Sequence, residues 1–298
     1  MENPEVKATG LAAKLLPRSV VITGASSGIG RASALLMARE GFEVFAGVRR
    51  DADARKLVEE GGPLISPLTI DVTDGASIQS AARELSLRLN DRGLDGLVNV
   101  AGIGTSGPVE FLTQNELRRI FDVNVFGQIA VIQAFMALLL KARGRIVNIS
   151  SVGAHIAIPF GGALTASKGA FGLLSDSLRM EVRGFGVTVS VVEPGAIRTP
   201  AVDKTLGDVE GVIAALPPEG ATRYGDLLRR FTKQAHARES GGSEPEVVAG
   251  AIRHALTARR PRTRYVVGKD SRKLTLLPRF LPDRILDWLR MKMLGLAD

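Results

Sequence analysis

The chain has 298 residues, of which 45% are hydrophobic and 23% charged, a balance typical of a globular α/β protein. It contains no cysteine, which excludes disulfides, a thiol nucleophile and thiolate metal sites, and suits a reducing cytoplasm. The formal charge is +8, but residues 259–298 hold eleven Lys and Arg against four Asp, so a basic tail follows a nearly neutral body and nucleic-acid binding is not expected.

The sequence of the first half of the chain predicts neither a signal peptide nor a membrane-spanning helix. Residues 1–17 carry two glutamates and lack the basic start and long apolar run of a signal peptide. The most apolar run, Ile129–Leu140, is shorter than the roughly 20 residues that cross a bilayer, and predicts a buried helix. We therefore expect a cytoplasmic protein. Its three histidines, at 155, 236 and 254, are too scattered to predict a metal site.

Apolar, β-rich runs alternate with helical patterns along the chain. Because these runs are continuous rather than alternating, they predict strands buried on both faces, as in a Rossmann-type doubly wound parallel α/β sheet with about seven strands. The expected strands are Ser19–Thr23, Glu43–Val48, Leu64–Asp71, Asp95–Val100, Arg145–Ser150, Val187–Glu193 and Arg264–Gly268.

No linker divides the chain, so we expect one domain over residues 1–298. Residues 201–243 contain "LPPEG" and "SGGSEP" and predict a long lid-like excursion. The alternative is a disordered insertion. Residues 271–298 form the basic amphipathic tail.

The first strand leads into "TGASSGIG", residues 23–30, and then into a helical pattern. A strand, a glycine turn and a helix start together predict a pyrophosphate site, because tight turns need glycine and helix N-termini attract anions. The second strand ends in Val48, Arg49 and Arg50, where an acidic residue would favour NAD. Arg49 therefore predicts a contact with the 2′-phosphate of NADP, unless both arginines are simply solvated.

Several motifs in order resemble the short-chain dehydrogenase/reductase superfamily along nearly the whole chain. They are "TGASSGIG", "DVTD", "VNVAG", "FDVNVFG", "NISS", "ASK" and "PGAIRT". The segment "RPRTRYVVG" is similar to the branch that handles hydroxysteroids, retinoids and other apolar carbonyls. The resemblance implies hydride transfer between NADP(H) and a hydrophobic substrate, with NAD(H) a weaker candidate.

The resemblance also implies the residues of the site. Ser151, Lys168 and Asn124 match the family's catalytic serine, lysine and asparagine. The serine polarises the reacting oxygen, a tyrosine protonates it, the lysine supports the tyrosine and the nicotinamide ribose, and the asparagine holds a water. The cofactor residues implied are Thr23, Gly24, Ser26, Ser27, Gly28, Ile29, Gly30, Arg49, Asp71, Val72, Asn99, Ala101, Gly102, Lys168, Pro194, Gly195, Ile197 and Thr199.

The tyrosine position holds Leu164, which is thirteen residues after Ser151 and four before Lys168. Loss of a positioned acid typically costs ~10²–10⁴ in rate. Three functions stay open: an atypical NADPH-dependent reductase of a carbonyl or enone, a non-redox isomerase, cyclase or dehydratase, and an inactive NADP(H)-binding protein. A second departure is Val100, where the family usually has asparagine.

Other side chains are candidates for the missing acid or for the substrate pocket. His155 lies four residues after Ser151, and its ordinary pKa suits acid–base work. Tyr224, with Leu164, is expected to bind substrate, and His236 lies in the same presumed lid. Leu164 could instead pack in the core on one face with Phe171 and Leu174.

The tail and two long helices suggest partners. Residues 282–298 place Ile285, Leu286, Leu289, Met293 and Leu296 within about 100° of one another. This face predicts packing against the body, a second subunit or an anionic membrane. By family resemblance, helices over Glu116–Leu140 and Ala163–Val182 would form a homodimer or homotetramer contact.

Overall fold

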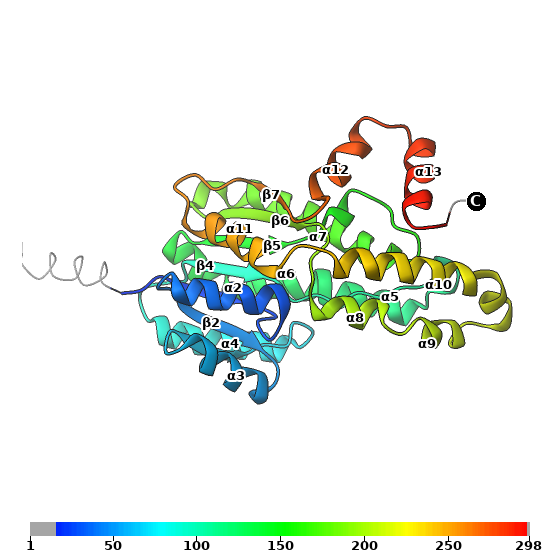
Figure 1. The fold of residues 1–298 in the computed structure, drawn as a ribbon. Coiled ribbons are helices and arrows are strands. Elements are labelled where there is room, and N and C mark those ends of the chain that lie inside the picture. Colours follow the sequence, from blue (N-terminus) through cyan, green and yellow to red (C-terminus); the bar gives the residue numbers. More distant parts are fainter. Residues whose placement is uncertain (1–15, 297–298) are drawn as a thin grey trace, which may run out of the picture.

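A computed structural model describes residues 16–296, and a parallel sheet runs through its centre (Figure 1). The strand order is β3-β2-β1-β4-β5-β6-β7. The order reverses between β1 and β4, so the loops that leave these strands diverge and open a crevice at their carboxyl ends. The strands are β1 (Ser19–Ile22), β2 (Glu43–Val48), β3 (Ile65–Thr69), β4 (Gly96–Asn99), β5 (Arg145–Ile149), β6 (Thr188–Pro194) and β7 (Arg264–Val267).

Helices cover both faces of this sheet. α2, α3 and α11 lie on one face, whereas α4, α6 and α7 lie on the other. These helices are α2 (Gly28–Arg39), α3 (Asp51–Gly61), α4 (Gly75–Leu89), α6 (Gly127–Ala142), α7 (Gly162–Glu181) and α11 (Pro245–Thr257). The shorter connecting segments are η1 (Val109–Phe111), α5 (Gln114–Phe121), the π-helical η2 (Asp122–Phe126), η3 (Val152–Ala154) and η4 (Arg183–Phe185).

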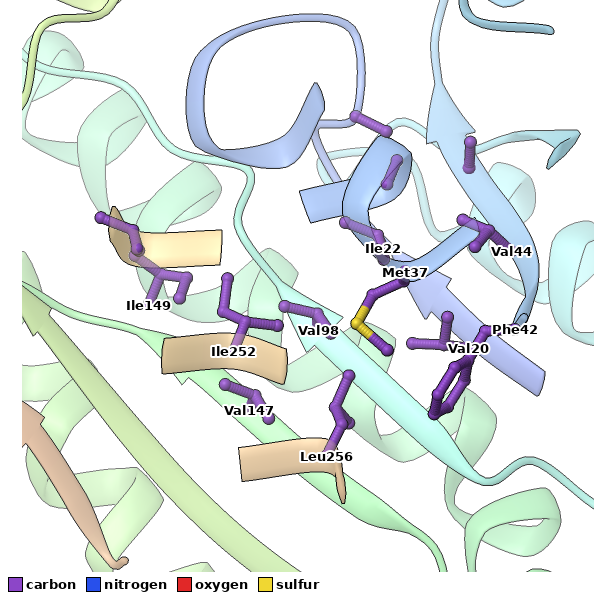
Figure 2. Close-up of a cluster of buried hydrophobic side chains, with 14 of the residues drawn as sticks. Val20, Ile22, Met37, Phe42, Val44, Val98, Val147, Ile149, Ile252 and Leu256 are labelled. Carbon is purple, nitrogen blue, oxygen red and sulfur yellow. The ribbon is translucent and has the colours of Figure 1, made fainter. Parts of the chain in front are cut away.

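Successive residues of the strands point to opposite faces of the sheet and pack into two separate hydrophobic cores. Val98 and Val147 pack with Met37 of α2 and Ile252 of α11 (Figure 2). Their neighbours Leu97 and Ile146 point to the opposite face and pack with α4, α6 and α7. Both faces of the central strands are therefore buried, which agrees with the predicted parallel sheet and explains why these strands are continuous apolar runs.

The predicted buried helix is part of a longer helical stretch. Residues Gln114–Ala142 are long and apolar enough to cross a membrane by length and composition alone. Half of the apolar window is buried inside the protein, however, and Val131, Phe135 and Leu139 pack fully against the sheet. This stretch is a core helix of the α/β body.

Residues 201–243 are mostly helical, although the sequence suggested an irregular excursion or a disordered insertion. Three helices account for the segment: α8 (Pro200–Leu206), α9 (Val209–Ala214) and α10 (Pro218–Ser240). Prolines begin α8 and α10 in their first turn, where the missing N–H has no intrahelical partner to lose. The prolines and glycines that indicated a loop therefore start and end helices.

The basic tail folds back over the body beside these helices (Figure 1). It consists of α12 (Ser271–Leu276), η5 (Leu277–Arg279) and α13 (Asp283–Met293). Leu294 and Leu296 are buried against Leu206 of α8 and Phe231 of α10. The predicted apolar face of the tail is thus divided, since Ile285 and Met293 on the same face stay exposed.

Candidate active site

The glycine-rich turn after β1 has the backbone that the sequence predicts. Gly24 and Gly28 have φ angles of +64° and +51°, where a side chain would be strained. A Cβ on Gly30 would lie 2.1 Å from the Gly24 carbonyl oxygen, so the helix can start this close to the turn only with glycine. The N-terminus of α2 therefore points its first N–H groups at the crevice, as an anion site requires.

Two neighbouring loops contact this turn and hold it in place. The Thr23 hydroxyl oxygen accepts hydrogen bonds from the backbone N–H of Val100 and Ala101, at 3.0 and 3.2 Å. A Cβ on Gly24 would lie 2.9 Å from the Ala101 nitrogen, and one on Gly28 would lie 3.1 Å from Thr199. The fold thus brings the loops after β1, β4 and β6 into contact around one crevice.

The loops after β2 and β3 carry Arg49 and Asp71, which are predicted to contact the cofactor. The Arg49 side chain is 73% exposed and its guanidinium lies 3.8 Å from the Asp71 carboxylate. Asp71 accepts hydrogen bonds from the backbone N–H and hydroxyl of Thr73, which, with Arg49, lower the pKa of its carboxyl. Arg50 is instead engaged by Asp53 at 2.8 Å. Arg49 is therefore the arginine that can turn toward a bound phosphate.

Ser151, Leu164 and Lys168 line one cavity, which has a volume of about 360 Å³. Ser151 follows β5, whereas Leu164 and Lys168 are one turn apart on α7 and hence on the same helix face. The Lys168 ammonium donates to the Ile149 carbonyl at 3.0 Å, and its burial lowers the pKa of this side chain to about 8. Leu164 thus presents an apolar wall to the cavity beside the lysine.

The hydroxyls next to Leu164 are already used inside α7. Thr165 donates to the carbonyls of Gly161 and Gly162, and Ser167 donates to the Leu164 carbonyl at 2.8 Å. The alternative that Leu164 packs in the core with Phe171 and Leu174 is wrong. Phe171 is buried in the core, whereas Leu174 is exposed. Leu164 lies on nearly the same helix face as Phe171 but two turns earlier, where that face lines the cavity.

Asn124 sits in the π-helical turn η2 between α5 and α6. Its side-chain oxygen accepts from the Ile103 N–H at 2.9 Å, and its amide donates to the Ile103 carbonyl and the Ser167 hydroxyl. A π-turn inserts one residue into a helix and is frequent at functional sites. Here it turns Asn124 toward the loop that follows β4, between the glycine turn and α7.

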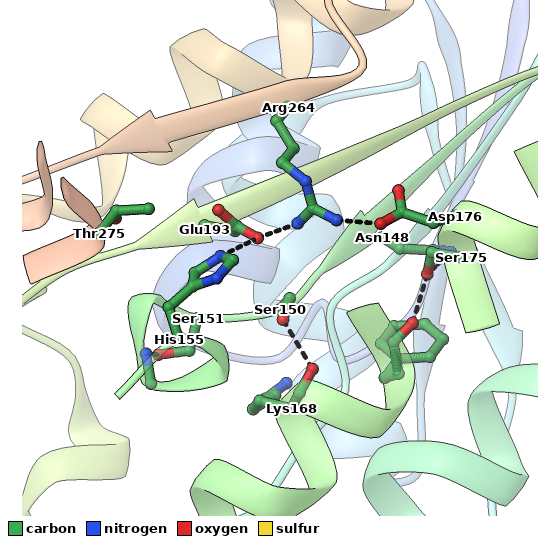
Figure 3. A network of polar contacts seen from close by, with 12 residues as sticks. Asn148, Ser150, Ser151, His155, Lys168, Ser175, Asp176, Glu193, Arg264 and Thr275 are labelled. Atoms are coloured by element: carbon green, nitrogen blue, oxygen red, sulfur yellow. Dashed lines mark hydrogen bonds and ion pairs between the residues drawn. The ribbon is translucent and has the colours of Figure 1, made fainter. Parts of the chain in front are cut away.

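His155 points away from the cavity and into a buried ionic network. Its Nε2 lies 2.9 Å from the Glu193 carboxylate, which is completely buried in β6 (Figure 3). Arg264 of β7 bridges Glu193 and Asp176. A buried carboxylate needs such partners, so His155 fixes the loop that follows Ser151 against β6. Proton donation from Nε2 of His155 would require the ring to leave Glu193.

The two lid residues proposed from the sequence also lie outside this cavity. The Tyr224 hydroxyl donates to Glu110 at 2.7 Å and lines a second, separate cavity. His236 is partly exposed and lies 2.9 Å from the Asp203 carboxylate. Among residues 16–296, no three His, Asp or Glu side chains are grouped closely enough to hold a metal ion.

Several cavity residues escaped the sequence reasoning. Arg290 of the tail lines the cavity with Met293 and Leu294. Glu239 of α10 also lines it, and burial raises the pKa of its carboxyl. No local motif marks these residues, because they reach the site only when α10 and the tail fold over the sheet.

The chain was compared with known proteins. The model of the short-chain dehydrogenase family matches residues 18–209. Retinol dehydrogenase 5 of Mus musculus is 39% identical over 276 residues, which cover 90% of this chain and 86% of that protein. The uncharacterized oxidoreductase YbbO of Escherichia coli is 36% identical over 93% of this chain and 95% of its own.

Solved structures agree with the fold. A short-chain dehydrogenase from Streptomyces avermitilis superposes with a TM-score of 0.69 at 28% identity, covering 94% of this chain and 96% of that one. A second, from Burkholderia cenocepacia in complex with NADP, has a TM-score of 0.69 at 22% identity and covers 93% of this chain and 98% of that one. At that identity the second match supports the fold alone.

Proposed function

The chain belongs to the short-chain dehydrogenase family, and we propose that it is an NADP(H)-dependent oxidoreductase whose substrate is an apolar carbonyl or enone. The observation that carries the proposal is the shared cavity of Ser151 and Lys168, with Leu164 at the position of the family's tyrosine. The remaining walls are mostly aliphatic, including Ile156, Ile158 and Val202. Such walls favour a hydrophobic substrate.

The residues present fit a bound dinucleotide. The bare glycines of the first turn leave room for a pyrophosphate against the α2 N-terminus, and Arg49 supplies a cation for a 2′-phosphate. A Cβ on Gly102 would lie 3.3 Å from the Lys168 ammonium, so this glycine keeps a path open beside the lysine. When bound there, the nicotinamide supplies a hydride.

Ser151 and Lys168 divide the remaining chemistry. The Ser151 hydroxyl can donate a hydrogen bond to the substrate oxygen as negative charge develops on it. With no phenol at position 164, we assign the role of proton donor to the Lys168 ammonium. Its pKa is about 8, so most of these side chains carry the proton below that pH. An enone is the easier substrate, because the enolate formed by hydride addition is a weaker base than an alkoxide. Its α-carbon then takes the proton.

Two other functions use the same cavity without hydride transfer. A non-redox isomerase, cyclase or dehydratase would form product with no change in NADPH absorbance. An NADP(H)-binding protein without activity would bind the cofactor tightly and form no product. Assays with hydrophobic ketones and enones therefore separate all three functions by combining cofactor affinity, absorbance and product analysis.

Homo-oligomer formation is proposed through α6 and α7. Phe126 at the start of α6, and Leu173 and Met180 on α7, are large apolar residues more than 60% exposed. Apolar side chains gathered on an outer helix face usually mark an interface. These two helices are the ones that the family resemblance indicates for subunit contact.

We also propose a cytoplasmic protein whose tail makes reversible contact with anionic membranes. The tail patch consists of Leu276, Leu277, Phe280, Ile285 and Trp288, all exposed. Arg272, Lys273, Arg284 and Lys292 are exposed in the same segment. Exposed aromatic and aliphatic side chains beside basic ones suit an interface with acidic headgroups.

Substituting Leu164→Tyr should raise ketone reduction roughly 10²–10⁴-fold, because it restores a phenolic acid one helical turn from Lys168. The measurement is kcat from NADPH absorbance, with Leu164→Phe as the matched variant that adds the ring without the hydroxyl. An equal response to the Tyr and Phe substitutions would contradict the proposed site.

In the unsubstituted protein, the rate of ketone reduction should decline as pH rises through about 8, since Lys168 then loses its proton.

Substituting Arg49→Ala should weaken NADPH binding roughly tenfold or more and leave NADH binding nearly unchanged, because a charge-assisted contact to the 2′-phosphate is lost. Equilibrium fluorescence titration measures both affinities. Arg50→Ala is the control, since Arg50 is already paired with Asp53. Wild-type affinities for NADPH and NADH within a factor of two would exclude the proposed selectivity.

The oligomer prediction is checked by light scattering during size exclusion. We expect a dimer or tetramer that dissociates when Leu173→Glu and Met180→Glu are combined, because two buried carboxylates would face the partner. As a control, two exposed residues of α4 are also changed to glutamate. The Leu87→Glu, Arg83→Glu variant should leave the mass of the oligomer unchanged. A monomeric wild-type chain would disprove the contact.

Flotation with phosphatidylserine-containing vesicles tests the tail patch. The protein should float, and the double variant Phe280→Asp, Trp288→Asp should not, because it removes apolar area and adds negative charge. Point variants are preferred to truncation, since Leu294 and Leu296 help close the cavity. Leu87→Asp on α4 is the control. Wild-type protein that stays with the soluble fraction at low salt would rule the contact out.

A further inference from the structure

The cavity lined by Ser151, Leu164 and Lys168 is the reaction cavity. A second cavity of about 320 Å³ lies next to it and is not used by the proposed mechanism. We call it the distal cavity. Its walls are almost entirely apolar, and they come from η1 and the residue before it, the turn before α7, the helix α10 and the tail. The lining residues are Pro108, Val109, Glu110, Pro159, Phe160, Tyr224, Leu227, Met291 and Leu296.

The two cavities share one thin partition. Along the turn before α7, Ile158 and Gly161 line the reaction cavity, whereas Pro159 and Phe160 between them line the distal cavity. The Phe160 ring centroid lies 5.4 Å from that of Phe231, which lines the reaction cavity. It lies 6.1 Å from that of Tyr224, which lines the distal cavity. The Phe160 side chain therefore stands between the two spaces.

The backbone at Phe160 is strained. Its φ angle is +59°, in the left-handed region that bulky residues seldom adopt. The Gly107 N–H donates to the Phe160 carbonyl at 2.8 Å and holds the turn in this conformation. Such strain persists only where the surrounding structure enforces it, and it is concentrated at functional sites. Here it directs an aromatic ring into the partition.

We propose that the distal cavity receives the far end of an elongated, neutral, apolar substrate, whose reacting carbonyl or enone lies beside Ser151, and that Phe160 is the gate between the two cavities. This proposal rests on the proposed function, because it extends the substrate-binding region of the same site. The ligand class is a long hydrocarbon chain or a fused-ring compound with its reactive group at one end.

Volume and charge support this occupant. The reaction cavity is also lined by Ile29, Gly195 and Thr199, on the side where the dinucleotide would bind, so only part of its 360 Å³ is available to substrate. A long molecule has to extend elsewhere, and the distal cavity adjoins the reaction cavity across residues 158–161. At its rim Glu110 is paired with Arg223 and accepts a hydrogen bond from Tyr224. The paired rim favours an uncharged tail over a carboxylate.

Binding of straight-chain alcohols to the full-length protein with saturating NADP⁺ tests the proposal without requiring turnover. Affinities of 1-hexanol, 1-decanol and 1-tetradecanol are measured by displacement of a fluorescent anilinonaphthalene sulfonate probe. Each methylene that enters the distal cavity should strengthen binding roughly fourfold. 14-Hydroxytetradecanoate, whose hydroxyl end would lie beside Ser151, should bind at least tenfold more weakly than 1-tetradecanol, since the carboxylate at its far end would meet the apolar wall of the distal cavity.

Leu227→Trp fills the distal cavity from α10 and should weaken 1-tetradecanol tenfold or more while leaving 1-hexanol unchanged. Met291→Trp fills it from the tail and provides an independent variant if the first does not fold. Phe160→Ala should strengthen binding of the longest alcohol and speed its association. Leu87→Trp, on the exposed surface of α4, should alter none of these affinities.

A chain-length profile that is identical in wild type and in both filling variants would overturn the proposal, as would equal losses for short and long alcohols. Chain-length dependence that persists in a protein without any NADPH-linked turnover would support the distal cavity while contradicting the proposed oxidoreductase function. The two claims are therefore tested separately.

Discussion

The parallel direction of all seven strands is the constraint on which the site depends. Parallel strands place all their carboxyl ends at one edge of the sheet, and the reversal of order between β1 and β4 opens a crevice there. The glycine turn, Asn99, Ser151 and Pro194 follow or end four neighbouring strands. Residues separated by more than 100 positions thus meet at one edge without any direct pairing of their side chains.

Within that edge, Leu164 presents an aliphatic side chain to the cavity beside Lys168. The two residues lie one turn apart on α7 and line the same cavity. An aliphatic neighbour offers no hydrogen bond to an ammonium, and Lys168 instead donates to the Ile149 carbonyl. Burial lowers the pKa of Lys168 to about 8, and the proposed proton transfer depends on this shift.

Buried charge elsewhere has a structural role. Glu193 is wholly buried in β6 and is contacted by His155 and Arg264, which join the loop after Ser151 to the last two strands. Removing one member would leave an uncompensated charge in a low-dielectric interior. The histidine that looks most reactive in the sequence is therefore engaged in holding the loop, while the lysine faces the cavity.

The cavity is closed by segments that have little to do with the sheet. Leu206 of α8, Phe231 of α10 and the tail residues Leu294 and Leu296 form a small separate cluster above the crevice. This cluster is a common wall of the reaction and distal cavities. It contains a few residues from three segments that are distant in the sequence, and none of them belongs to the sheet.

The amino-acid sequence by itself determined the sheet, its strands, the glycine turn and the leucine in place of tyrosine, because these depend on local periodicity and on motif spacing within one element or its neighbours. Strand limits differed by only one or two residues, since hydrogen bonding rather than hydrophobicity ends a strand. Only the tertiary structure decided that His155 faces Glu193, that Tyr224 lies in a second cavity and that Arg290 lines the first. Those placements depend on how loops, α10 and the tail pack over the sheet. The apolar face of a helix predicts that the helix will pack, but it does not identify the residues that the helix will contact.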